Sequence, residues 1–165
     1  MAESEALPFD PIERAGVLWE KHVGDASSMR VATSIMRVQQ LLLGEFDRVL
    51  KPLGITFARY EVLRLLSFSR EGRLPLSVIG ERLMVHPTSV TNAIDRLVAS
   101  GLVARTPDDQ DRRRVYASLT TEGKRVLRRA TKALMAIDFG LGELSVAERD
   151  RAYELLRVVR SSDFA

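Results

Sequence analysis

Cysteine is absent from this chain of 165 residues, and histidine occurs only as His22 and His86. Without cysteine there is no disulfide framework, no thiolate zinc site and no cysteine-based oxidation sensor. The two histidines fall in different predicted elements, so we expect no metal site and no cofactor. A glycine-rich phosphate loop, a nucleophile elbow and a paired catalytic motif are also missing, so we do not expect an enzyme.

Long apolar runs are lacking too. The longest candidate, Leu41 to Leu43, is interrupted by Gly44 and Glu45, whereas a membrane-spanning helix needs roughly 20 apolar residues. The N-terminal stretch Met1 to Glu5 is acidic and has neither the basic start nor the apolar core of a secretion signal. We therefore expect a cytoplasmic protein that does not contact a membrane.

The surplus of positive charge is small. Lys and Arg number 25 against 22 Asp and Glu, a net charge of +3, and this balance does not by itself favour nucleic acid as a partner. The segment from Leu74 to Thr120 contains six arginines and five acidic residues. Any contact with nucleic acid must therefore depend on where individual arginines lie.

Helical periodicity dominates what is present, and we predict a mainly α fold with a small β-hairpin. The predicted helices cover residues 11–22, about 29–50, 77–83, 87–100 and 121–139, and two more begin after Thr56 and after Ser145. Pro52 and Gly54 end the long helix. Residues 67–75 are predicted to form a loop.

The helices at 77–83 and 87–100 are separated only by the turn Met84 to His86, which is the spacing of a helix-turn-helix. In the first, Gly80 is small enough for the second helix to cross closely. The second has a predicted buried stripe of Val90, Ile94, Leu97 and Val98. Its opposite face carries Thr88, Ser89, Thr91, Asn92, Asp95 and Arg96. Short polar side chains there suit the major groove of DNA, but helix capping and ordinary solvation explain them equally well.

A hairpin follows this helix. Alternation in Val115 to Leu119 predicts one strand, Leu102 to Arg105 supplies its partner, and residues 107–109 form the turn. The run Arg112 to Arg114 lies at or beside the tip, within reach of a minor groove or of phosphates. A charged tip also serves solubility, and pairing with nearby aspartates is an alternative. The order helix, helix, basic hairpin favours a winged helix-turn-helix that binds duplex DNA.

Four segments together resemble the multiple-antibiotic-resistance regulator (MarR) family: His86 to Leu97, Gly101 to Val103, Asp111 to Arg114, and Leu119 to Gly123. The resemblance covers about Met29 to the C-terminus. It implies a homodimeric transcription factor in which the first long helix and the last two form the dimer interface.

Site residues are implied position by position. In the recognition helix, the residues implied to face the major groove are Pro87, Thr88, Ser89, Thr91, Asn92 and Arg96. In the wing, Asp111 orients basic side chains and Arg113 enters the minor groove, while Arg112 and Arg114 contact the DNA backbone or stiffen the hairpin. Met84 stands where many family members have glycine, which makes the turn a point to check.

The expected organisation has three parts: an N-terminal arm with a short helix (1–28), a helical dimerisation region (29–54 and 121–165) and the winged helix-turn-helix DNA-binding domain (55–120). Both long helices have wide apolar faces, which favours a homodimer. The alternative is that these helices pack on each other within one chain.

The expected function is that of a regulator, most simply a repressor, that binds a pseudo-palindromic operator on double-stranded DNA. The resemblance also implies release by a small aromatic or anionic effector, whose ligand-binding residues are not assigned. Trp19 and His22 are similar to the added helix of the urate-responsive branch, but packing explains Trp19 more simply. A sequence-tolerant architectural DNA-binding protein and a regulator without a ligand stay open as alternatives.

Overall fold

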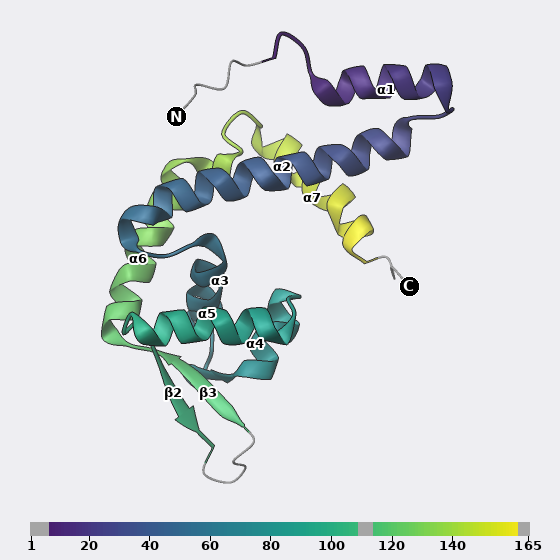
Figure 1. Ribbon diagram of the computed structural model, residues 1–165. Helices are drawn as coiled ribbons and strands as arrows, with labels where there is room; N and C mark the ends of the chain where they lie inside the picture. The colour runs from purple at the N-terminus through teal and green to yellow at the C-terminus, as the bar shows by residue number, and fades with distance from the viewer. Residues whose placement is uncertain (1–6, 109–113, 162–165) are drawn as a thin grey trace. The chain divides into compact units, whose positions relative to one another are not determined.

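The computed structural model describes residues 7–108 and 114–161, and it is mainly helical with a small sheet (Figure 1). The elements are α1 (Pro11–His22), α2 (Ser27–Leu50), the 3-10 turn η1 (Lys51–Leu53), α3 (Phe57–Ser67), β1 (Arg73–Pro75), α4 (Leu76–Leu83), α5 (Pro87–Ala99), β2 (Val103–Pro107), β3 (Val115–Leu119), α6 (Thr121–Ala136), the 3-10 turn η2 (Asp138–Gly140) and α7 (Val146–Arg160). The predicted fold class is confirmed.

The chain divides into two compact units, Met1–Gly44 and Glu45–Ala165. The first contains α1 and most of α2, and the second contains the end of α2 and the elements after it. Across the described ranges, no helix is both long enough and apolar enough to cross a membrane.

In the first unit, α1 packs on α2 through a glycine. Asp10 caps α1 by accepting a hydrogen bond at 2.8 Å from a backbone N–H of the first turn, and Pro11 occupies the first helical position. Gly16 is buried under the guanidinium of Arg30, where a Cβ would lie 2.0 Å from Nε. Arg30 also pairs with Glu20 at 2.6 Å. Because Gly16 has no side chain, the guanidinium of Arg30 can pack across α1 at this position.

The core of the second unit consists of aliphatic side chains around α3. Those with almost no exposed surface are Leu50, Val62, Leu63, Leu66, Ile79, Ile94, Leu97 and Leu134. An aromatic cluster extends it: the ring centroids of Phe46 and Phe57 lie 4.5 Å apart, and Phe139 meets Phe46 edge-on at 5.9 Å. This core holds the helices that support the sheet and α5.

The sheet has three antiparallel strands in the order β1-β3-β2, so the predicted two-stranded hairpin lacked one strand. Leu74 of β1 and Arg105 of β2 both pair with Ala117 of β3, and Ala117 is buried. The prediction of a loop over residues 67–75 was wrong for residues 73–75, which form β1. A three-residue strand is too short to show alternation, and its partner is distant in sequence.

The end of α6 also differs from prediction. The helix predicted over residues 121–139 ends at Ala136, because Asp138 and Phe139 take left-handed backbone conformations (φ 47° and 51°). Contact with Phe46 helps hold Phe139 there. The last helix, α7, begins after Ser145 as predicted, and Ser145 caps it by forming a capping box with Glu148. Yet α7 buries none of its residues, and Leu155 is 64% exposed.

Candidate DNA-binding surface

The pair α4 and α5 forms a close helix-turn-helix. Gly80 is buried at the crossing, where a Cβ would lie 3.3 Å from a methyl group of Val90 and 3.4 Å from the Val85 carbonyl oxygen. This confirms the predicted role of Gly80 as the small residue of the crossing. Met84 ends α4 in the left-handed conformation (φ 55°, ψ 40°) that glycine adopts most easily. The turn therefore keeps its geometry with methionine in the glycine position.

The start of α5 is fixed by two neighbouring residues. His86 is the N-cap, and its Nδ1 accepts a hydrogen bond at 3.2 Å from the backbone N–H of Thr88. Pro87 takes the first helical position, as predicted. Thr91 donates from Oγ1 to the Pro87 carbonyl oxygen at 3.2 Å. The Thr91 hydroxyl is therefore bonded within the helix, whereas the side chains of Thr88 and Ser89 face solvent.

The predicted contact residues share one exposed surface. The recognition residues that are exposed on α5 are Pro87, Thr88, Ser89, Thr91, Asn92 and Arg96. The stripe on the other face is buried at Val90, Ile94 and Leu97. Val98 was wrongly included in that stripe: it lies at the edge of the helical face, one residue beyond Leu97, and is 37% exposed.

Charge on this surface is set partly by a residue of the wing. Arg105 of β2 pairs with Asp95 of α5, with 2.7 Å between Nη1 and Oδ1. The pair is partly exposed, so it contributes little stability, but it neutralises the acid that neighbours Arg96. Sequence reasoning missed Arg105, because the two partners belong to different elements and no local spacing connects them.

The wing is formed by β2 and β3, which Figure 1 shows as a hairpin beyond α4 and α5. The backbone N–H of Asp108 donates to the Arg114 carbonyl oxygen at 3.0 Å, which continues the pairing toward the tip. Arg114 is exposed. The predicted wing residues Asp111, Arg112 and Arg113 lie outside the described residues. On the opposite edge of β3, the guanidinium of Arg73 stacks over the ring of Tyr116, 4.4 Å from its centroid.

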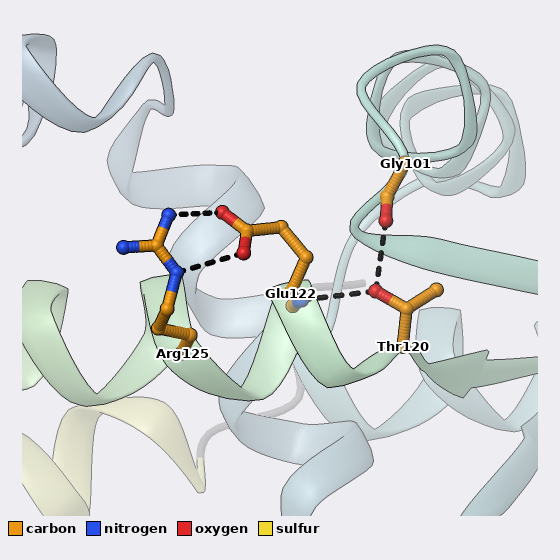
Figure 2. Close-up of polar contacts among 5 residues, drawn as sticks. Gly101, Thr120, Glu122 and Arg125 are labelled. Carbon is orange, nitrogen blue, oxygen red and sulfur yellow. Dashed lines mark hydrogen bonds and ion pairs between the residues drawn. The ribbon is translucent and has the colours of Figure 1, made fainter.

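The base of the wing is tied to both neighbouring helices by one hydroxyl group (Figure 2). Thr120 Oγ1 donates to the Gly101 carbonyl oxygen at 2.8 Å and accepts from the backbone N–H of Gly123 at 2.9 Å. Gly101 follows α5, and Gly123 is in the first turn of α6. Thr120, which is the N-cap of α6, therefore also links the exit of α5 to α6.

A cleft of about 590 Å³ lies between the start of α3 and the exposed side of α5. Arg59 contributes from α3, and Asn92, Asp95 and Arg96 contribute from α5. Two predicted contact residues therefore also border a cavity.

Comparison with known proteins gives a consistent result. The family model described as "MarR family" matches residues 55–115. The solved structure of Sco5413, a MarR family transcriptional regulator from Streptomyces coelicolor, is 56% identical with a TM-score of 0.76, covering 81% of this chain and 92% of that one. The chain belongs to the MarR family. MarR family proteins are transcription regulators and not enzymes.

Two further relatives extend the comparison. The transcriptional repressor MdtR of Bacillus subtilis is 37% identical over 93 residues, which is 56% of this chain and 59% of the repressor. The chain thus spans about three fifths of that relative's length. The structure of a MarR mutant from Escherichia coli complexed with operator DNA is 25% identical, with a TM-score of 0.71, and covers 86% of this chain and 97% of that one.

Proposed function

We propose that this MarR family member is a transcription repressor that binds a pseudo-palindromic operator as a homodimer. In this proposal α5 enters the major groove from Pro87 onward. Asn92 and Arg96 contact base edges or phosphates, and Thr88, Ser89 and Thr91 line the approach. The wing reaches the flanking minor groove: Arg113 enters it, Asp111 orients the basic side chains, and Arg112 and Arg114 contact the backbone.

The exposed polar face of α5 carries this proposal. Its N-terminal half has short hydroxyl and amide side chains, which allow a helix end to approach bases closely. The acid on this face, Asp95, forms an ion pair with Arg105 at 2.7 Å. Arg96 is therefore the dominant charge on the exposed face of α5. The likeness to a MarR protein complexed with operator DNA supports the same use of this surface.

The domain organisation is part of the proposal. Residues 29–54 and 121–165 form the dimerisation region, residues 55–120 bind DNA, and residues 1–28 are an added arm. The exposed apolar residues of α7 support this division, because a second copy of the chain would cover them. Paired DNA-binding domains then place half-sites about one helical turn apart.

Release by a small aromatic or anionic molecule completes the proposal. BpsR of Bordetella bronchiseptica is 26% identical, with a TM-score of 0.72, and its DNA binding is regulated by 6-hydroxynicotinic acid. A ligand of that kind in this protein acts in the cytoplasm, beside the chromosome.

Selection of bound genomic fragments, with wild type and Asn92→Ala compared, tests the proposal. We expect wild type to select an inverted repeat and Asn92→Ala to lose preference at one position per half-site, since a bidentate base contact contributes about 1–3 kcal/mol. Glu13→Gln, at an exposed residue of α1 outside the proposed dimerisation and DNA-binding regions, is the control and should select the wild-type motif. An unchanged motif for Asn92→Ala refutes the base contact, and binding without any motif identifies an architectural protein.

A further inference from the structure

The positive charge of this chain is concentrated on α6. That helix carries five cations and one acid, a net charge of +4, whereas the whole chain has a net charge of +3. The five cations are all exposed: Lys124, Arg125, Arg128, Arg129 and Lys132. The rest of the chain is therefore slightly acidic, and α6 alone accounts for the positive surplus.

These cations lie on one side of the helix. At about 100° per residue they fall within an arc of about 140°, and Lys124 and Lys132 lie about 12 Å apart along the helix axis. The buried residues of α6 occupy the other side: Gly123, Val126, Leu127, Ala130 and Leu134. The exposed side of α6 is therefore an extended row of positive charge and not a single cationic point.

The charge of this row is mostly not neutralised. Glu122, the acid of α6, makes two hydrogen bonds to Arg125, of 2.7 Å and 2.5 Å (Figure 2), and these bonds hold the pKa of Glu122 below its usual value. No ion pair to another described residue is formed by the other four cations, Lys124, Arg128, Arg129 and Lys132.

The arrangement disfavours the isolated helix. Like charges lie four residues apart at Lys124 and Arg128, at Arg125 and Arg129, and at Arg128 and Lys132, and such pairs repel each other. Lys124 and Arg125 are also near the N-terminal end of α6, where the helix dipole disfavours cations. A bound polyanion would relieve both effects.

Helix α7 shows how an exposed helix of the same chain is otherwise charged. Its four arginines alternate with three acids, and Arg157 pairs with Glu154 at 2.8 Å. Contact with water is thus achieved in α7 by charges of both signs. Solvation alone does not account for the single sign of the α6 row.

The position of α6 indicates which polyanion it meets. The helix begins at the base of the wing (Figure 1), directly after Thr120, which also bonds to the Gly101 carbonyl oxygen at 2.8 Å. In the proposed function the wing contacts the minor groove beside the half-site. The duplex that continues past the wing is then the polyanion nearest to the first turns of α6.

We propose that the cation row of α6 binds the phosphate backbone of duplex DNA beyond the wing, outside the half-site that α5 contacts. The flanking duplex bends toward α6, and its phosphates lie against Arg128, Lys132 and their neighbours. The contact has no base preference, because phosphate contacts carry no sequence information. It rests on the proposed function, since a dimer on its operator places flanking DNA beside α6.

Salt dependence on a short and a long operator tests this contact. The inverted repeat selected from genomic fragments is used as a duplex of about 20 base pairs, which holds the half-sites alone, and as one of about 50 base pairs with the repeat at its centre. Fluorescence anisotropy is measured at protein concentrations that leave a long duplex with a scrambled repeat unbound. We expect the slope of log K against log salt to be steeper on the long duplex by about 0.9 for each phosphate that α6 neutralises.

The double variant Arg128→Gln/Lys132→Gln separates the α6 contact from the rest of the interface. It should reduce the difference in slope between the long and the short duplex by about 1.8, for two lost phosphate contacts. An effect on dimerisation would change binding to both duplexes alike and leave this difference unaltered. The variant should fold, because it removes like-charge pairs from α6. The control Arg14→Gln/Lys21→Gln removes the same charge from exposed residues of α1 and should keep the wild-type difference.

The outcomes distinguish this contact from the proposed function. Equal slopes for wild type on the two duplexes would overturn the α6 contact and leave the repressor proposal standing. The same reduction in both double variants would also overturn it, because net charge and not position would then be the cause. If wild type binds neither duplex, both proposals fail.

Discussion

Glu61 of α3 is a half-buried acid without a partner among the described residues. Burial raises the pKa of its carboxyl above the ordinary value of 4.5. Between the unfolded and the folded pKa, the folded protein binds more protons than the unfolded chain. The free energy of unfolding therefore falls as pH rises through that range, and the loss is complete above the folded pKa.

Glu61→Gln removes this penalty. We expect the variant to have a higher melting temperature than wild type at pH 7, and the difference to vanish as pH falls toward 4.5, the ordinary value for glutamate. Melting curves from pH 4 to pH 7.5 give the comparison, with the exposed Glu81→Gln as control. A constant difference at every pH would contradict an ionisation effect.

Met84 holds a left-handed conformation in which an L side chain is strained, and it is 77% exposed. We predict that Met84→Gly raises the free energy of unfolding by about 1 kcal/mol, because glycine lacks the Cβ that causes the strain. Met84→Ala keeps the Cβ and should show no such gain in a denaturant titration. If both substitutions had the same effect on the free energy of unfolding, the cause would be loss of the methionine side chain beyond Cβ and not relief of backbone strain.

At the scale of elements, the first turn of α6 lies directly on the residue that leads into β2. A Cβ on Gly123 would be 2.0 Å from the Leu102 carbonyl oxygen, which is backbone and cannot turn away. We predict that Gly123→Ala lowers the free energy of unfolding by about 1–3 kcal/mol or more, as overpacking does. Denaturant unfolding of the purified variant measures it.

Gly44→Ala provides the matched control for that substitution. Gly44 lies within α2, and a Cβ there would have no atom within 4 Å outside the helix's own backbone. Alanine should therefore stabilise the helix by up to about 1 kcal/mol, through its higher helix propensity. A loss of stability at both positions would mean that contact with Leu102 is not the cause.

How much the sequence predicts differs from element to element. The recognition helix was predictable because Val90, Ile94 and Leu97 repeat at helical spacing and Pro87 marks its start. The strand β1 was not, since three residues carry no periodic signal and their partner β3 is distant in the chain. The Asp95–Arg105 ion pair depends in the same way on packing between α5 and β2. Local patterns thus define helices and their exposed faces, whereas contacts between elements require the fold.

For the whole molecule, the exposed apolar side chains of α7 predict self-association. We expect wild type to sediment as a dimer at micromolar concentration and Leu155→Glu to shift it toward monomer, because a charge replaces a residue that the second copy would bury. Arg82→Gln of α4 changes the net charge by the same amount, and its side chain is exposed. That control should remain dimeric, and a monomeric wild type would refute the prediction.

The absence of any buried residue in α7 has a consequence for protein turnover. A helix that is covered only by a second copy makes folding stability depend on the amount of protein present. In the proposed dimer, the last helix is open to proteases at low abundance and is protected by the partner copy at higher abundance. The cellular level of the chain then influences both how long each molecule survives and how fully its DNA site is occupied.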